Sequence, residues 1–139
     1  KISDEDMKKT QDLKSQGNSC FGKAQFEEAC EKYQEAIGVL NVTDPRHEHA
    51  DLSQVLWMNL AAAELKRSKH VNALAASSNA LAFGPKAKAY VVIFTSSRTM
   101  SYYPSNITRI IYTNIFPMYH RILTLNHTGT IVVHVHMRV

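Results

Sequence analysis

Two stretches of this chain, residues 10–43 and 54–87, share one spacing of small and large side chains. Each spans 34 residues and has the periodicity of two amphipathic helices joined by a short turn. In the first stretch these positions are Leu13, Gly17, Phe21, Phe26, Ala29, Tyr33, Ala36 and Ile37. A unit of this kind cannot bury its apolar face alone, so it stacks on a neighbouring unit. The pattern predicts an all-α helix–turn–helix solenoid over residues 7–90.

Helix boundaries follow from the turn residues and from the ends of the apolar stripes. We expect helices over residues 7–22, 26–40, 52–65 and 71–81, with Gly84 and Pro85 closing the last one. Residues 44–53 are polar and form an insert between the two units, either as a loop or as a helical extension. We expect the side chains of Tyr33 and Trp57 to lie in the core.

Residues 91–139 break the repeat pattern. They contain many Ile and Thr residues, and the tail from Arg121 to His136 has the composition of a β-hairpin. We therefore expect an irregular or β-like segment after the repeats. It is either a true β-rich appendage or a sequence joined to a truncated repeat array by alternative splicing or a change of reading frame. The abrupt loss of the period favours the second origin.

Charge is divided unevenly along the chain. Residues 1–64 contain all twelve acidic residues, whereas residues 65–139 contain nine Lys and Arg and no acid. These basic residues are thinly spread and no nucleic-acid motif accompanies them, so no binding to nucleic acid is expected. No apolar run reaches about 18 residues, which argues against a membrane span. The polar, acidic start is unlike a signal peptide, so we expect a cytoplasmic protein, and the missing initial Met indicates a fragment of a longer one.

The sequence has no sign of catalysis or of a bound cofactor. It contains neither a phosphate-binding glycine loop nor a nucleophile motif, so we expect no enzyme activity and no cofactor. His134 and His136 would share one face of a strand, but no acid or Cys accompanies them, and no metal site is expected. Cys20 and Cys30 are expected to be reduced, partly buried thiols.

Lys14 and Asn18 are the first candidate binding residues. They lie four positions apart and therefore share one face of the first helix, away from its apolar stripe. An ammonium group and a side-chain amide can both donate hydrogen bonds. The pair therefore suits a carboxylate, which accepts from both.

Residues 10–90 resemble the co-chaperone class of tetratricopeptide repeat proteins, which includes the chaperone organising protein and the large immunophilins. The resemblance is carried by Leu13-Lys14-Ser15-Gln16-Gly17-Asn18, Tyr33-Gln34-Glu35-Ala36-Ile37, Asn59-Leu60-Ala61-Ala62-Ala63 with Leu65-Lys66, and Lys86-Ala87-Lys88-Ala89. It implies a carboxylate clamp that binds a peptide through Lys14, Asn18, Asn59 and Lys88, with Lys86 as the alternative to Lys88. The implied partner is the C-terminal peptide of a cytosolic heat-shock chaperone, which ends in Glu-Glu-Val-Asp.

The chain departs from that family at Val92, where the clamp has an Arg. Glu64 and Ser77 also replace large side chains of the family, which predicts a loosely packed second unit. Two other functions therefore remain open: a non-chaperone repeat scaffold with a vestigial clamp, or a fragment of a larger immunophilin or phosphatase. An uncapped repeat end also predicts self-association through its apolar stacking face.

Overall fold

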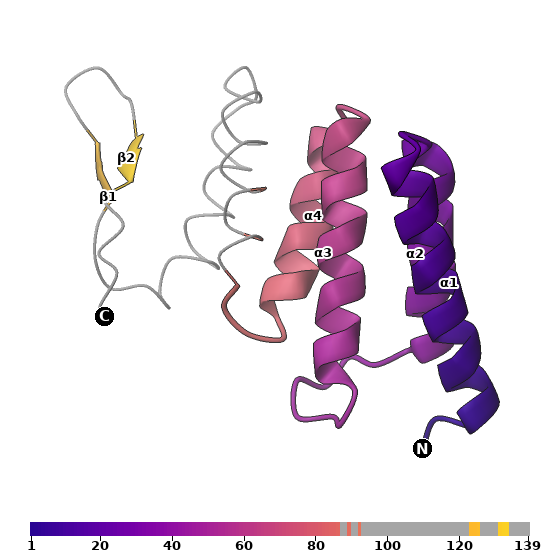
Figure 1. Cartoon of the computed structure of the whole chain (residues 1–139). Coiled ribbons are helices and arrows are strands. Elements are labelled where there is room, and N and C mark those ends of the chain that lie inside the picture. The colour runs from indigo at the N-terminus through magenta and orange to yellow at the C-terminus, as the bar shows by residue number, and fades with distance from the viewer. Residues whose placement is uncertain (87–88, 90–91, 93–122, 126–130, 134–139) are drawn as a thin grey trace, which may run out of the picture. The chain divides into compact units, whose positions relative to one another are not determined.

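Four α-helices form the N-terminal part of the protein. A computed structural model describes residues 1–86, 89, 92, 123–125 and 131–133, and the chain divides into two compact units, Lys1–Tyr102 and Tyr103–Val139. The helices of the first unit are α1 (Asp4–Gly22), α2 (Phe26–Leu40), α3 (Ala50–Lys66) and α4 (His70–Leu81) (Figure 1). Residues 1–86 contain no strand, so the prediction of an all-α fold is confirmed for this part of the chain.

The start of α1 is fixed by a side-chain cap. The Ser3 hydroxyl oxygen accepts a hydrogen bond from the backbone N–H of Asp6 at 3.1 Å, and three acidic residues fill the first turn. Acidic side chains at this end are stabilised by the helix dipole. The helix therefore begins at Asp4, three residues before the start predicted from the apolar stripe.

The insert between the two helical pairs is partly a loop and partly a helix. Its last residues are helical because α3 begins at Ala50. Near that start the buried hydroxyl of Ser53 donates a hydrogen bond to the backbone carbonyl of Val42 at 3.0 Å. This bond connects the segment between α2 and α3 to the first turn of α3. The predicted insert is therefore a loop in its first part and helical in its last part.

Each helix packs on the next one along the chain. Consecutive helices run antiparallel, with α1 against α2, α2 against α3, and α3 against α4 (Figure 1). Their shared core is apolar and is made largely of small and medium side chains, among which Ala29, Ala36, Leu56, Ala63 and Ala73 are fully buried. Two helical hairpins packed in this order are compatible with a repeat fold.

The end of α4 is held by a side chain from α3. Gln54 is buried, and its Nε2 atom donates hydrogen bonds to the carbonyl of Ala80 at 2.9 Å and to that of Gly84 at 2.7 Å. Carbonyl groups at the C-terminal end of a helix lack partners within the helix. Gln54 therefore adds a donor to the Ala80 carbonyl, which also accepts from the backbone N–H of Phe83 at 3.2 Å, and it connects the two helices of the second hairpin.

Two residues beyond α4 extend the apolar core. Ala89 and Val92 both have helical backbone conformation, and both side chains are buried, Val92 with 6% of its surface exposed. Val92 is thus helical although it lies beyond residue 90, where the repeat pattern was predicted to end. The remaining described residues form two short antiparallel strands, β1 (Leu123–Leu125) and β2 (Ile131–Val133), with Thr124 opposite Val132. Both strands lie within the segment that has the composition of a β-hairpin.

Candidate functional site

Two of the predicted clamp residues meet across the two helical hairpins. Asn18 is an exposed residue of α1, and Asn59 is a half-buried residue of α3. The Nδ2 atom of Asn59 donates a hydrogen bond to Oδ1 of Asn18 at 3.3 Å. Side chains 41 positions apart in the sequence thus come together on one surface.

A third side chain completes this contact from the core. Tyr33 of α2 has 2% of its surface exposed, and its hydroxyl donates a hydrogen bond to the same Oδ1 atom of Asn18 at 2.7 Å. The Asn18 carbonyl oxygen therefore accepts from two helices at once. We call Asn18, Asn59 and Tyr33 the amide cluster.

The Tyr33 hydroxyl is neutral at ordinary pH. Burial raises its pKa above the usual value of a tyrosine, with smaller contributions from Cys20 and Cys30. A neutral phenol has one hydrogen to donate, and this hydrogen is used on Asn18.

Lys14 lies one helical turn before Asn18 on α1 and is half-buried. It forms no ion pair with any residue that the structure describes. Lys88, the fourth predicted clamp residue, lies outside the described residues, whereas its alternative Lys86 is described and exposed. Val92, at the position where the resemblance implied an Arg, is buried in the apolar core and offers no polar group.

Tyr33 is the member of the amide cluster whose sequence pattern predicted a place in the core and no contact at the site. Its ring does lie in the core, as expected. A buried tyrosine hydroxyl nearly always has a hydrogen-bond partner, so the choice of Tyr over Phe at this position was the available signal. The partner itself lies 15 residues earlier in the chain, and only the packing of α1 on α2 identifies it.

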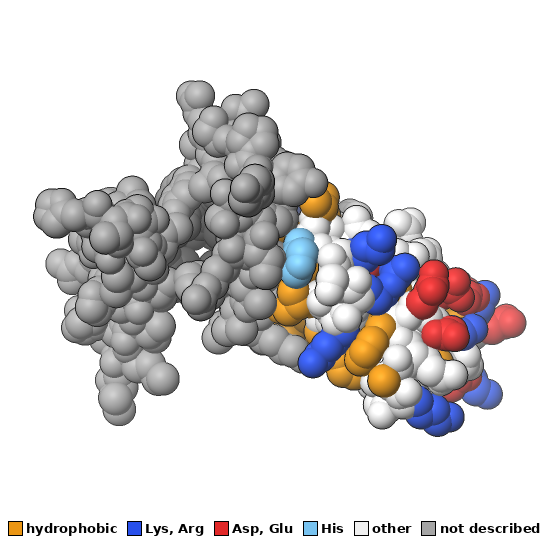
Figure 2. All heavy atoms as spheres, turned by 90° about the horizontal axis from the view of Figure 1, so that it is seen from above, with side chains coloured by type: hydrophobic (Ala, Val, Ile, Leu, Met, Phe, Trp, Pro, Cys, Tyr) orange, Lys and Arg blue, Asp and Glu red, His pale blue; other side chains and the backbone are white. Residues whose placement is uncertain are grey.

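A second polar contact joins the two hairpins on another surface. Glu64 of α3 has 2% of its surface exposed, and its carboxylate pairs with Arg67 at 3.2 Å. Arg67 also reaches Glu27 of α2 at 3.4 Å. Acidic and basic side chains lie beside one another at the end of the unit where α2 and α4 begin (Figure 2). Ion pairing with Arg67 thus accounts for a carboxylate at the buried position 64.

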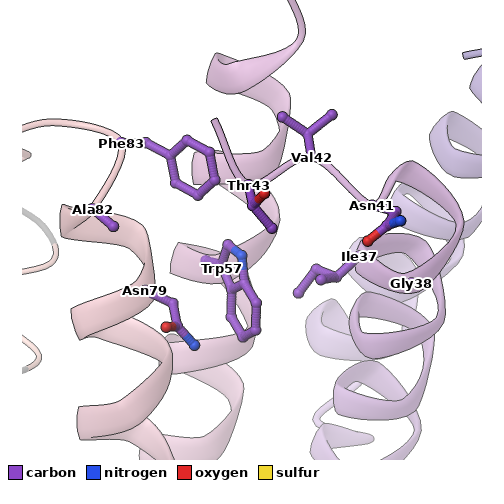
Figure 3. A pocket seen from close by; sticks show the side chains of 9 residues that line it. All are labelled: Ile37, Gly38, Asn41, Val42, Thr43, Trp57, Asn79, Ala82 and Phe83. Carbon is purple, nitrogen blue, oxygen red and sulfur yellow. The ribbon is translucent and has the colours of Figure 1, made fainter. Parts of the chain in front are cut away.

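An uncharged pocket opens between α2 and α4. It has a volume of about 290 Å³, and the side chains of Ile37, Trp57 and Phe83 lie around it (Figure 3). Its remaining lining residues are Gly38, Asn41, Val42, Thr43, Asn79 and Ala82. Because no lining residue is charged, this pocket is a poor match for the acidic end of a peptide, and it is separate from the amide cluster.

Neither a membrane span nor a metal centre is found in the part of the chain that the structure describes. None of its helices is both long and apolar enough to cross a membrane. Its His, Cys, Asp and Glu side chains do not gather in groups of three or more that could hold a metal ion.

Comparison with protein-family models gives no match, and comparison with curated proteins gives none. The amide cluster is therefore the strongest guide to function.

Proposed function

We propose that residues 7–90 form two tetratricopeptide repeats that act as a protein–protein adaptor and bind the C-terminal acidic peptide of a heat-shock chaperone. The observation that supports this function best is the contact between Asn18 and Asn59. The family resemblance implies that both amides act on one carboxylate. A shared site requires them to be neighbours, and they lie within hydrogen-bond distance.

The amide cluster leaves several donor hydrogens for a ligand. Asn18 uses its carbonyl oxygen within the cluster, so both hydrogens of its Nδ2 group remain to be donated. Asn59 has one Nδ2 hydrogen left after its bond to Asn18, and Lys14 adds an ammonium group on the same helix face. A C-terminal Asp carries two carboxylates, which together accept from several donors.

The expected affinity is moderate because part of the clamp is replaced. Each charge-assisted hydrogen bond contributes about 1.5–3 kcal/mol, and the position of the family's Arg is occupied by the buried Val92. A clamp without that cation loses at least one such bond. We therefore expect binding in the micromolar range or weaker.

Calorimetric titration tests this proposal directly. The ligand is a peptide ending in Met-Glu-Glu-Val-Asp, compared with the same peptide amidated at its C-terminus. We expect binding of the free acid that is strongly reduced by amidation and by Lys14→Ala. Lys8→Ala is the matched control, since Lys8 is an exposed lysine of the same helix that is not among the clamp residues.

The alternative function is a non-chaperone repeat scaffold with a vestigial clamp. The observation that supports this alternative is the uncharged pocket beside Trp57 and Phe83, which suits an apolar side chain of a partner. If a chain that circular dichroism shows to be helical fails to bind the acidic peptide at millimolar concentration, the clamp proposal is wrong and the scaffold becomes the better explanation.

A further inference from the structure

We infer that Tyr33 is a positioning residue, which holds the Asn18 amide with its donor group outward and thereby sets the strength of carboxylate binding. This inference rests on the proposed function. Tyr33 does not touch the ligand in this scheme. It acts only through the amide of Asn18, whose oxygen it binds at 2.7 Å.

The ring of Tyr33 is held in a fixed place by the backbone of α1. A Cβ atom added to Gly17 would lie 2.6 Å from Cε1 of Tyr33 and 2.8 Å from Cδ1, so the ring lies directly against the glycine. Only 2% of the residue is exposed. The hydroxyl therefore presents its hydrogen at a defined point beside α1, one residue after Gly17.

The Asn18 amide needs such a constraint because the residue is exposed. A terminal amide torsion is broad and roughly two-fold, so an unconstrained asparagine presents either its oxygen or its nitrogen to the surface. Two donors, from Tyr33 and Asn59, point at Oδ1 and select one of these orientations. In that orientation the Nδ2 group is left for the ligand, whereas the opposite orientation would present a carbonyl oxygen to a carboxylate.

Preorganised donors bind more tightly because they lose less freedom when the ligand arrives. Removal of the Tyr33 hydroxyl should therefore weaken peptide binding without removing any direct contact. Burial raises the pKa of the Tyr33 phenol, so this donor keeps its hydrogen at neutral pH, where a peptide carboxylate is ionised.

Tyr33→Phe is the test, because it removes the hydroxyl and keeps the ring against Gly17. We expect the affinity for the free-acid peptide to fall about three- to tenfold, as for the loss of one hydrogen bond. The loss should vanish in an Asn18→Ala background, since the hydroxyl then has no amide to orient. Equal losses in the two backgrounds would overturn the inference, and so would unchanged affinity in the single variant.

Ser53→Ala is the matched control. It also removes a buried hydroxyl that donates a hydrogen bond, but Ser53 binds the Val42 carbonyl and is not part of the amide cluster. We expect it to lower stability and to leave peptide affinity unchanged. If it weakens binding as much as Tyr33→Phe does, the effect of Tyr33 is a general loss of stability and the inference is wrong.

A second variant and a second measurement keep the two proposals separable. Asn18→Asp retains an oxygen for Tyr33 and Asn59 but removes the outward donor, and should abolish binding while the chain stays helical.

In nuclear magnetic resonance spectra, Tyr33→Phe should shift the side-chain NH₂ signals of Asn18 even without peptide. If the unmodified chain does not bind the peptide, the proposed function fails. Unchanged Asn18 signals refute the positioning role independently of binding.

Discussion

The ring of Tyr33 in α2 lies against Gly17 in α1, with its Cε1 atom 2.6 Å from the place that a Cβ atom on Gly17 would occupy. Hydrogen alone fits between the two helices at this point. The residue that packs so tightly against Gly17 is therefore the one that also holds Asn18.

Gly17→Ala should destabilise the protein, because the methyl group displaces the buried Tyr33 ring. Overpacking of this kind costs about 1–3 kcal/mol, which exceeds the gain of up to about 1 kcal/mol from replacing a helical glycine by alanine. Urea denaturation followed by circular dichroism measures the change. Gly38→Ala in α2 is the control: a Cβ there has no neighbour within 4 Å, so this variant should be as stable as the original chain or more stable.

Replacement of Arg67 by Met should also destabilise the protein. It leaves the carboxylate of Glu64, whose side chain is 3% exposed, without its partner in the interior. An unsatisfied buried polar group costs about 1–3 kcal/mol, and more when it is charged. The added change Glu64→Leu should recover most of this loss in a denaturation experiment. A double variant as unstable as Arg67→Met would show that Arg67 contributes through another contact, such as the one with Glu27.

Stability should fall between pH 9 and pH 11 because of Cys30. Burial, followed by the nearby Glu64 carboxylate, raises the pKa of this thiol from 9.0 to about 11. In that interval the folded chain keeps a proton that the unfolded chain loses, so the stabilisation is complete below pH 9 and is lost as the pH rises through the folded value. The loss is on the order of 2–3 kcal/mol. The free energy of unfolding, obtained from denaturation curves at several pH values, should depend less on pH in this interval for Cys30→Ala than for the unmodified chain.

Gln54→Leu should weaken the end of α4. The substitution removes the hydrogen bonds to the carbonyls of Ala80 and Gly84, each of which then lacks that donor. We expect a loss of about 1–3 kcal/mol, with the largest decrease in amide protection in the last turn of α4. Gln34→Leu, at an exposed position of α2, is the matched control and should change stability little. Equal losses in the two variants would contradict a capping role for Gln54.

The helical part of the fold was largely predictable, because its apolar period is strong. The bounds of α2 agree with the prediction, and those of α4 agree to within one residue. The starts of α1 and α3 were placed too late. The start of α1 depends on the Ser3 cap, which an apolar stripe does not contain, whereas α3 begins without a side-chain cap. Ser3 caps α1 at a point before its apolar stripe. In α3 the hydroxyl of Ser53 binds the Val42 carbonyl in the connection that precedes the helix.

The candidate site was predictable in part. Spacing singled out Asn18 and the resemblance added Asn59, whereas the role of the Tyr33 hydroxyl depends on a distance between two helices that periodicity does not supply. The same holds for Glu64, whose burial becomes understandable only beside Arg67. The predictions for Lys88 and for most of residues 91–139 concern positions outside the described residues, and they stay predictions.

The double hydrogen bond of Gln54 has a consequence for the way this polypeptide can be extended. A side chain near the beginning of the second hairpin fixes the carbonyl of Gly84, the last residue before Pro85. The direction in which the chain leaves the hairpin is therefore set by residues that precede it in the sequence. The point at which the chain leaves its last helix is thus defined from within the hairpin itself.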